Sequence, residues 1–566
     1  MDKRWLIKDI PSSDDIAELS KAINVNASLT AILLQRGINT FESARQYFRP
    51  TLEHLHDPFL MKGMRNAVDR LRVAITSEEK ILIYGDYDVD GTTSVALVSS
   101  YLRRFHSNID VYIPDRHAEG YGVSLIGVEW AVQNGFGLII ALDCGIKSAE
   151  LVAFAKSHHV EFIICDHHLP DDNIPSAIAV LDPKQSDCPY PYKELSGAGI
   201  GFKFMQAYAR EYREEAEVYE YLDLVAVSIA SDIVPITDEN RILTYYGLRK
   251  LNDNPVAGLK ALKDIALIKN DLDVSSIVFT LGPRINAAGR VAHGSAAVEL
   301  LNSTTVEQAN DLAEKLNLKN EIRKQFDTEI TGEALAMIES SDTLRAAKST
   351  VLYKNTWHKG VIGIVAARCV EKYYRPTVIL TESNNKVTGS ARSVSGFDLY
   401  GAILACSDLL EKFGGHKYAA GLTLSHDNLA QFQQKFEQVV SASITEEMLT
   451  PVIEMDMPLH FDSITAKFMS ILKQMAPFGP GNPKPVFQAS EVYVFNSLSS
   501  FKDKHIRFLA GQHNNENVFQ AVGFDLGSHY SKLSEGAHFK MAFTIEENTY
   551  NGVTSVQLRI KDLKFI

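Results

Sequence analysis

Four short clusters of acidic residues and histidines contain the side chains best suited to catalysis in this sequence. The clusters are Asp86-Tyr87-Asp88-Val89-Asp90, the single Asp143, Asp166-His167-His168, and Asp232 after Ser231. Three acids at alternate positions are expected about once by chance in a chain of this length and acid content. An acid followed by two histidines is expected only about 0.06 times, so this cluster is the most specific signal.

These residue types favour divalent metal binding. Carboxylates within about 4 Å of one another repel by roughly 4 kcal/mol per pair at an effective dielectric of 20, so such a cluster needs cations. Carboxylates with one or two imidazoles favour Mn²⁺ or Mg²⁺ over structural zinc. Two such ions about 3.5–4 Å apart activate water and stabilise the leaving oxygen in phosphoester cleavage. The alternative is that these acids cap turns or helices and that His168 is a core histidine, which suits any one cluster better than all four together.

The clusters need a scaffold that brings them together. Short apolar runs at 80–84, 111–114, 138–142, 162–165 and 177–181 alternate with helical segments such as 94–105 and 148–157. This alternation predicts a doubly wound, mostly parallel sheet. Three of the four clusters directly follow a strand, and open α/β sheets bind ligands at the carboxyl ends of their strands. We therefore expect the clusters to converge at one edge of the sheet.

The sequence pattern changes twice in the rest of the chain. Apolar residues repeat every four positions within 304–340, which predicts one long connector helix of about 55 Å. A second α/β block follows, and a proline-glycine cluster at 477–483 precedes short strands that suit a five-stranded OB-like barrel. The predicted parts are a helical segment packing on the core (1–70), the doubly wound domain (71–302), the connector helix (303–341), a smaller α/β domain (342–446) and the barrel (447–566).

Composition limits the class of protein further. The 566 residues include 57 basic and 70 acidic ones, a net charge of −13, so only a local basic groove could bind nucleic acid. The five cysteines form no C-x-x-C pair, which argues against a disulfide framework or a thiolate zinc site and favours a reducing compartment. Charges interrupt every apolar run near the N-terminus, so we expect a cytoplasmic protein without a membrane partner.

Together with further motifs, the four clusters resemble the DHH phosphoesterase superfamily, and most closely its bacterial single-strand-specific exonucleases. The second α/β block resembles the DHHA1 domain, and the similarity covers nearly the whole chain. The further motifs are Gly282-Pro283-Arg284-Ile285-Asn286-Ala287-Ala288-Gly289-Arg290, Trp357-His358-Lys359-Gly360-Val361-Ile362-Gly363, Gly414-Gly415-His416 and Pro477-Phe478-Gly479-Pro480-Gly481-Asn482-Pro483.

The resemblance implies a role for each residue of the four clusters. Asp143 would bridge two divalent ions, Mn²⁺ or Mg²⁺, and His168 would lie near the substrate phosphate. The other ligands would be Asp88 on one ion and Asp90, His167 and Asp232 on the second. Related pyrophosphatases have a histidine where this chain has Tyr84, so Asp86 would assist ligation of the first ion.

Candidate substrate contacts come from both the resemblance and the residue types. By resemblance, Arg284, Asn286 and Arg290 would form a phosphate-gripping loop, although ordinary helix surface is the alternative, and His358 belongs to a matching motif. Gly414, Gly415 and His416 suit a glycine turn that binds phosphate, and the alternative is a plain turn. Arg392 suits a bidentate phosphate contact, and the alternative is a solvated arginine on a loop. In the barrel, Lys502, Lys504 and Arg507 lie among aromatic residues and are candidate contacts to a nucleic-acid strand.

The function implied by the resemblance is a metal-dependent, 5′ to 3′ exonuclease on single-stranded DNA that acts in repair and recombination. Its partners would be a single-stranded-DNA-binding protein and a helicase, and the chain would be a monomer. One alternative is a DHH phosphodiesterase on oligonucleotides, cyclic dinucleotides or pyrophosphate, which would not need the C-terminal β region. The other is a non-catalytic replication scaffold, which would be expected to have lost metal ligands, whereas all four clusters are intact here.

Overall fold

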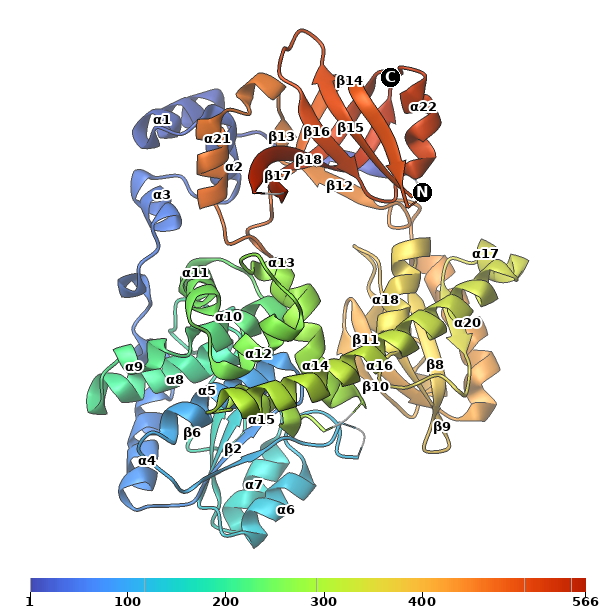
Figure 1. The fold of residues 1–566 in the computed structure, drawn as a ribbon. Helices are drawn as coiled ribbons and strands as arrows, with labels where there is room; N and C mark the ends of the chain where they lie inside the picture. The colour runs from blue at the N-terminus through green and yellow to red at the C-terminus, as the bar shows by residue number, and fades with distance from the viewer. Residues whose placement is uncertain (1, 117, 292, 503, 551) are drawn as a thin grey trace. The chain divides into compact units, whose positions relative to one another are not determined.

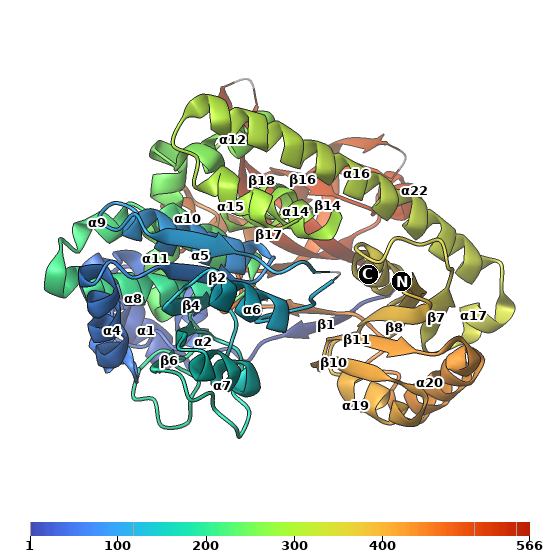
Figure 2. The same cartoon turned by 90° about the horizontal axis from the view of Figure 1, so that it is seen from below.

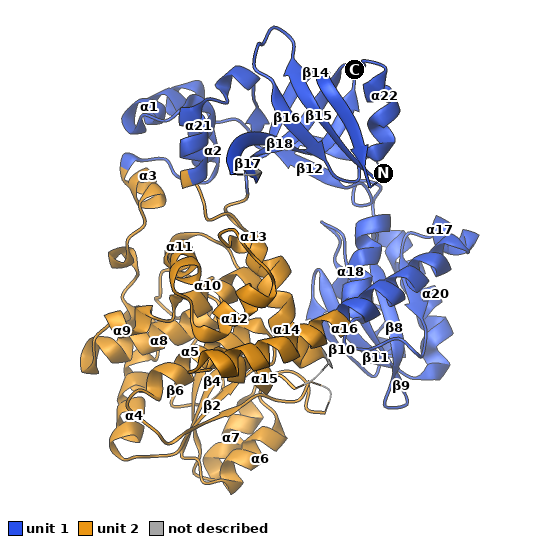
Figure 3. Ribbon diagram, in the orientation of Figure 1, with its two compact units in different colours: residues 1–41, 323–473, 484–566 blue, residues 42–322, 474–483 orange. Residues whose placement is uncertain are grey.

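A computed structural model describes residues 2–116, 118–291, 293–502, 504–550 and 552–566. The chain divides into two compact units (Figure 3). Unit 2 consists of Glu42–Ile322 and Gln474–Pro483, and unit 1 of Met1–Phe41, Arg323–Lys473 and Lys484–Ile566. None of the helices in the described ranges is both long and apolar enough to cross a membrane.

Unit 2 is built on a five-stranded parallel sheet with the strand order β3-β2-β4-β5-β6. The strands are β2 (Ile81–Gly85), β3 (Ile109–Tyr112), β4 (Leu138–Leu142), β5 (Glu161–Cys165) and β6 (Ala179–Leu181). Strands β2 and β4 are buried along their whole length because helices cover both faces of a parallel sheet. The predicted doubly wound sheet is confirmed, and each strand lies within two residues or so of the expected run.

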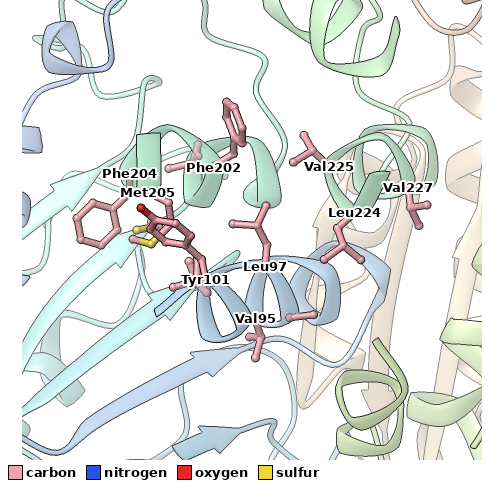
Figure 4. Close-up of a cluster of buried hydrophobic side chains, with 14 of the residues drawn as sticks. Val95, Leu97, Tyr101, Phe202, Phe204, Met205, Leu224, Val225 and Val227 are labelled. Atoms are coloured by element: carbon pink, nitrogen blue, oxygen red, sulfur yellow. The ribbon is translucent and has the colours of Figure 1, made fainter. Parts of the chain in front are cut away.

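Alternate residues of the central strands enter two different cores. Ile81, Ile83 and Ile140 pack in one core with α4 (Met64–Thr76), α5 (Val89–Leu102), α8 (Gly197–Tyr212) and α10 (Leu222–Ser231). Leu82 and Ile139 pack in the other with α6 (Leu125–Gln133) and α7 (Ala149–Ser157). Figure 4 shows side chains of α5, α8 and α10 meeting in the first core. Each fully buried large apolar side chain contributes about 1.5–3 kcal/mol, so this packing fixes α5 and α10 against the sheet.

The remaining helices of unit 2 precede the connector in the chain. They are α9 (Ala216–Tyr219), α11 (Asp238–Asp253), α12 (Ala257–Ile265), α13 (Val274–Ser276), a π-helix (Ile277–Leu281), α14 (Gly282–Val291) and α15 (Ser295–Leu301). The connector is α16 (Val306–Glu339), one uninterrupted helix of 34 residues (Figure 2). At about 1.5 Å per residue it is roughly 51 Å long, which confirms the predicted long helix.

Unit 1 contains a second, mixed sheet with the order β10-β11-β9-β8-β7. Its strands are β7 (Thr350–Tyr353), β8 (Thr377–Ser383), β9 (Lys386–Arg392), β10 (Lys412–His416) and β11 (Ala419–Leu424). Its helices are α17 (Asp342–Ala346), α18 (Ile362–Tyr373), α19 (Leu399–Leu404) and α20 (Leu429–Ser443). Only β7 and β8 run parallel, so this block is the smaller α/β domain that the sequence predicts.

The C-terminal strands close into a barrel (Figure 1). They follow the order β14-β15-β16-β18-β17, and β17 pairs back onto β14. Their bounds are β14 (Phe487–Phe501), β15 (His505–Gln512), β16 (Phe519–Gly523), β17 (Phe539–Tyr550) and β18 (Val553–Phe565), with α22 (Tyr530–Ser534) before β17. The predicted OB-like barrel is confirmed. Strands β12 (Val452–Met455) and β13 (Met457–Pro458) and helix α21 (Ala466–Gln474) precede it.

The structure divides the N-terminal segment expected at 1–70. Strand β1 (Arg4–Ile7) pairs in parallel with β12, and the indole of Trp5 donates a hydrogen bond to Asp562 at 2.8 Å. Helices α1 (Ser13–Ile23) and α2 (Ala27–Gln35) also belong to unit 1, whereas α4 belongs to unit 2 and α3 (Phe41–Phe48) begins at the border. These pairings join residues more than 400 positions apart, so local periodicity does not reveal them.

Candidate metal centre

The four clusters meet at one edge of the parallel sheet of unit 2. Asp143 follows β4, His167 follows β5, and Asp90 lies in the first turn of α5, which follows β2. Asp232 is the C-terminal cap of α10. The Nε2 atom of His167 lies 3.1 Å from Asp143 Oδ1 and 3.6 Å from both Asp90 Oδ2 and Asp232 Oδ2. The structure thus brings together side chains from four separate stretches of sequence.

Two groups of side chains could each hold an ion. One consists of Asp143, His167 and His168, and the other of Asp90, His167 and Asp232; within each group the ligand atoms lie within 4.8 Å of one another. His167 belongs to both groups, whereas the family resemblance makes Asp143 the shared ligand. Asp88 belongs to neither, and its Oδ1 accepts a hydrogen bond from the Gly91 amide as the N-cap of α5.

Asp90 is held by three donors that the sequence analysis did not identify. Its carboxylate accepts hydrogen bonds from the amides of Gly197 and Ala198, at 2.6 and 2.9 Å, and from the Ser228 hydroxyl at 2.6 Å. A Cβ at position 197 would lie 2.6 Å from the Cβ of Asp143, so only glycine lets α8 approach this closely. The run Gly197-Ala198-Gly199 was the only local signal of this close packing.

Asp166 positions its neighbours, and its own oxygens are already engaged. It accepts hydrogen bonds from the amides of Ile146 and His167 and from Nδ1 of His168, the last at 2.7 Å. The Nε2 atom of His168 lies 3.0 Å from the hydroxyl of Tyr121. Tyr121 is a further residue that the sequence did not reveal, because it lies in a loop without a motif of recognised chemistry.

The electrostatics of the site favour cations. Burial, followed by repulsion from Asp90 and Asp88, raises the pKa of Asp143 well above its usual range. Burial, followed by the charge of Asp88, raises the pKa of Asp86 to about 8; burial, followed by Asp90, raises that of Asp232 to about 8. Burial lowers the pKa of His167.

Several buried ligand atoms also lack a hydrogen-bond partner within the described ranges. They are Oδ2 of Asp86, Oδ1 of Asp143 and both ring nitrogens of His167. Because unsatisfied buried polar atoms are costly, and because these are oxygen and imidazole donors, the residues present fit divalent ions.

Tyr84 has a structural role here. Its buried hydroxyl donates to the Gly122 carbonyl at 3.2 Å and accepts from the Ser124 amide at 3.1 Å. The Gly122 amide in turn donates to Oδ1 of Asp86 at 3.3 Å, which leaves Oδ2 of Asp86 available. The Tyr84 hydroxyl therefore holds Gly122 and Ser124, just before α6 begins.

The expected phosphate-gripping loop with Arg284, Asn286 and Arg290 is helix α14, so that part of the prediction is wrong. The guanidinium of Arg284 donates to the Thr280 carbonyl at 2.8 Å and to the Asn317 side chain at 3.0 Å. Small residues on the helix allow close packing: a Cβ at Gly289 would lie 2.8 Å from the Tyr87 carbonyl oxygen. Helix α14 therefore packs against the first acidic cluster, while substrate contact by its polar residues stays a prediction.

In unit 1, Gly414, Gly415 and His416 lie on strand β10 at the edge of the sheet, where the sequence analysis expected a turn. A Cβ at Gly415 would lie 2.3 Å from the Ala419 carbonyl oxygen, which explains the glycine. Ala419 pairs with both His416 and Arg392, so these two side chains lie at the same level of the sheet. A Cβ at Gly363 in α18 would be 3.1 Å from Nη2 of Arg392, and the ring of His358 stacks on Phe326 at 5.0 Å.

Lys502, Lys504 and Arg507 are exposed at the β14–β15 end of the barrel. The ring of His505 lies 5.0 Å from that of Phe501 and 5.2 Å from that of Phe524, and Arg559 lies over Phe524 at 5.0 Å. Basic residues thus lie close in sequence to these rings, and Arg559 is in contact with one of them. We call Phe501, Lys502, Lys504, His505, Arg507, Phe524 and Arg559 the barrel-end cluster.

Comparisons with known proteins identify the same family in all three domains of the chain. Residues 80–229 match the DHH family N-terminal domain, 346–442 the DHHA1 domain and 455–562 the RecJ OB domain. The single-stranded-DNA-specific exonuclease RecJ of Bacillus subtilis is 34% identical over 565 residues, covering 99% of this chain and 70% of the relative.

Two solved structures extend this similarity to three dimensions. A crystal structure of RecJ with Mn²⁺ from Thermus thermophilus has a TM-score of 0.85 at 24% identity, covering 99% of this chain and 79% of that one. A crystal structure of exonuclease RecJ bound to manganese has a TM-score of 0.61 at 29% identity, covering 70% of this chain and 98% of that one.

Proposed function

Because the chain belongs to the RecJ family, we propose that it is a metal-dependent exonuclease that degrades single-stranded DNA at the sheet edge of unit 2. The observation that carries this proposal is the convergence of Asp90, Asp143, His167 and Asp232, with buried ligand atoms that have no partner in the described ranges. The curated relative acts on single-stranded DNA by name, and the solved relatives bind manganese.

Two divalent ions, Mn²⁺ or Mg²⁺, are the proposed cofactors. Asp90, His167 and Asp232 would hold one ion, and Asp143 would be shared with a second ion held with the help of Asp88 and Asp86. When bound, such ions activate water and neutralise charge on the phosphate. The three donors to Asp90 keep its carboxylate in one orientation, which supports a fixed site.

His168 is proposed to contact the scissile phosphate. Its Nδ1 atom is engaged by Asp166, so its Nε2 atom is the one directed toward a ligand, beside the Tyr121 hydroxyl. Two hydrogen-bonding groups therefore lie side by side next to Asp143. A hydrogen-bonding pair of this kind could orient a phosphate oxygen before cleavage.

Unit 1 is proposed to supply further contacts to the strand. Arg392 and His416 both pair with Ala419 and so lie at the same level of the sheet, and His416 directly follows Gly414 and Gly415. This arrangement suits binding of a phosphate group. Lys502, Lys504 and Arg507 of the barrel-end cluster suit the backbone of a longer strand, and neighbouring rings can stack on bases for about 1–3 kcal/mol each. This barrel supports a polymeric substrate over a dinucleotide or pyrophosphate.

Several finer proposals rest on the family resemblance. They are the 5′ to 3′ polarity, a role in repair and recombination, a single-stranded-DNA-binding protein and a helicase as partners, and a monomeric state. A cytoplasmic location is proposed because all five cysteines are free and buried.

Digestion of DNA labelled at either end tests the function. We expect single strands to be degraded from the 5′ end with Mn²⁺ or Mg²⁺, double strands to be resistant, and EDTA to stop the reaction. Equal rates on single and double strands, or undiminished rates in EDTA, would contradict the proposal. Release of label first from the 3′ end would contradict the polarity alone.

A further inference from the structure

One motif of the sequence has no role in the site as described so far. Residues Gln474–Pro483 contain the proline-glycine cluster, and they belong to unit 2 although the chain on either side belongs to unit 1. The chain therefore enters unit 2 for ten residues just before the barrel begins. We call this stretch the inserted segment.

The inserted segment is fastened to unit 2 by a buried arginine. The guanidinium of Arg241 in α11 donates to the carbonyls of Met475 and Ala476, at 3.2 and 3.0 Å, and to that of Tyr47 at 2.9 Å. It also lies over the Tyr47 ring at 3.8 Å. Hydrogen bonds to a buried charged group are stronger than neutral ones, so the carbonyls of the inserted segment have a defined position.

Asn482 makes the inserted segment rigid from within. Its buried side-chain amide donates to the carbonyls of Met475 and Pro477, at 3.0 and 2.7 Å, and its oxygen accepts from the Tyr47 hydroxyl at 2.9 Å. Its backbone also forms a reciprocal pair with Gly479 at 3.0 Å. The turn at Gly479 is thereby held in one conformation.

The rigid turn lies directly on the chain that follows Asp232. The amide of Ile236 donates to the Pro480 carbonyl at 2.7 Å. A Cβ at Gly479 would lie 2.4 Å from Cδ1 of Ile236, and one at Gly481 would lie 3.0 Å from Cγ2 of Thr237. An added methyl group fits at these points only if the Ile236 or Thr237 side chain shifts, so the two stretches are in direct contact.

The connection to Asp232 passes through a strained residue. Ile233 has a φ of +62°, a left-handed conformation that is unfavourable for a β-branched residue. The residue is 63% exposed, so its own packing does not compensate for this strain. Such conformations persist only where the surrounding structure enforces them. The stretch that follows is held by the Pro480 carbonyl and by the side chains of Tyr192 and Asn240, which donate to the Pro235 carbonyl at 3.0 and 2.9 Å.

Asp232 depends on this backbone more than Asp90 does. Asp90 accepts three hydrogen bonds from protein donors. In the described parts of the chain, the carboxylate of Asp232 accepts none, and its Oδ2 atom lies 3.6 Å from Nε2 of His167. Its position is therefore set by the end of α10 and by the strained turn at Ile233.

We infer that the inserted segment is a positioning element for the metal ligand Asp232. The inference rests on the proposed assignment of Asp232 to the metal centre. In this view, Pro480 and Gly479 hold Ile236, Ile236 holds the left-handed turn at Ile233, and the turn presents the Asp232 carboxylate to the ion. The proline-glycine motif thus acts on the metal centre without touching it.

The substitution Gly479→Ala tests the inference because its added methyl group would push against Ile236. Mn²⁺ affinity is measured on the full chain without DNA, by electron paramagnetic resonance of free Mn²⁺. We expect affinity about 10-fold weaker than in the unaltered chain, the lower end of the effect of displacing groups that orient metal ligands. Raising the Mn²⁺ concentration should restore exonuclease activity.

Gly258→Ala is a matched control in the same unit. Its Cβ would lie 2.2 Å from the Leu300 carbonyl oxygen, so it also strains the packing of unit 2, but between α12 and α15. We expect a lower melting temperature with unchanged Mn²⁺ affinity. If Gly479→Ala behaves in the same way, with Mn²⁺ affinity within twofold of the unaltered chain, the inference is overturned.

A second variant tests the role of strain. Asparagine tolerates the left-handed conformation, so Ile233→Asn should recover most of the Mn²⁺ affinity lost in Gly479→Ala. A further loss in the double variant would contradict the inference. Failure of the proposed function would give a different result. If the variants change Mn²⁺ affinity as expected but the unaltered chain does not degrade DNA, the inference holds and the proposed exonuclease function is wrong.

Discussion

The metal centre of unit 2 and the barrel-end cluster of unit 1 use charged side chains in opposite ways. At the metal centre, Asp90, Asp143 and His167 are buried, and three donors fix Asp90. In the barrel-end cluster, Lys502 and Lys504 are exposed beside rings that lie 5.0–5.2 Å apart. The difference shows that cleavage needs ligands at fixed positions, whereas holding a strand of any sequence needs accessible charge and ring faces.

The largest expected effect is on the buried side of this comparison. Asp143→Asn should lower the rate of DNA cleavage by at least about 100-fold, because even residues that only support metal ligands have effects of that size. Asparagine also tolerates the φ of +58° at this position, so the fold should persist. The metal-free variant should melt at a higher temperature than the unaltered chain, because the raised pKa of Asp143 reflects an unfavourable buried charge.

Cleavage kinetics and thermal unfolding without metal check both expectations. Near-normal activity in Mn²⁺ would remove Asp143 from the metal centre. A lower melting temperature of the metal-free variant would contradict the electrostatic argument.

Shortening the chain tests whether the metal centre depends on the inserted segment. From the sequence, a chain ending after Ser443 should retain an intact metal centre. The structure predicts otherwise, because this chain lacks the inserted segment and leaves the buried guanidinium of Arg241 without three of its acceptors. Leaving buried polar groups unsatisfied costs about 1–3 kcal/mol each, and more for charged groups.

A chain ending after Val486 retains the inserted segment and serves as the comparison. We expect it to bind Mn²⁺ in titrations, and the chain ending after Ser443 to bind more weakly and to unfold at lower temperature. Equal Mn²⁺ affinity and equal melting temperatures for the two chains would show that the metal centre is independent of the inserted segment.

The pH dependence of stability without metal should reveal the raised pKa values of the buried acids. The pKa of Asp86 and that of Asp232 are raised to about 8, above the unfolded value of about 3.9. Between these values the folded state binds more protons than the unfolded state, so stability without metal falls as pH rises through this window. The melting temperature of the metal-free chain should therefore be lower at pH 8.5 than at pH 6.

Saturating Mn²⁺ should remove most of this fall, because the ions replace the protons. Differential scanning fluorimetry at several pH values, with Mn²⁺ and with EDTA, measures both effects. Asp232→Asn should flatten the dependence in EDTA. A melting temperature that rises with pH in the metal-free chain would contradict the assignment of raised pKa values.

The smallest effect is expected at the barrel-end cluster. Replacing Lys502, Lys504 and Arg507 together by alanine should leave cleavage of very short oligonucleotides unchanged and weaken binding of long single strands. Each lost phosphate contact removes about 0.7 from the slope of log affinity against log salt, so the slope should fall by about 2. Fluorescence anisotropy of a labelled 30-mer with chelated metal, at several salt concentrations, gives the slope.

A charge-matched control replaces Lys260, Lys315 and Lys435, which form ion pairs with acids. This control should keep the full salt slope. If both triple variants change the slope equally, general charge and not the barrel-end cluster accounts for binding.

The sequence predicted the metal centre better than its surroundings. Parallel strands place their carboxyl ends at one edge, so Asp143 and His167 could be expected to meet from the order of apolar runs alone. Ser228 and Tyr121 could not be foreseen, because their contacts join distant stretches of chain through tertiary packing. The motif with Arg284 was expected in a loop, but its small residues serve the close packing of α14. Gly415 was expected in a turn, but it relieves a close approach between two strands.

The inserted segment also sets an order of events during synthesis. Unit 2 consists of Glu42–Ile322 and Gln474–Pro483, so its last ten residues leave the ribosome after all of residues 323–473. Synthesis of roughly 150 residues at about 5–20 residues per second takes about 8–30 s. Throughout this interval, three carbonyls that Arg241 uses in the finished fold do not yet exist. The nascent chain therefore completes unit 2 late, only after the second α/β block has been made and just before the barrel strands follow.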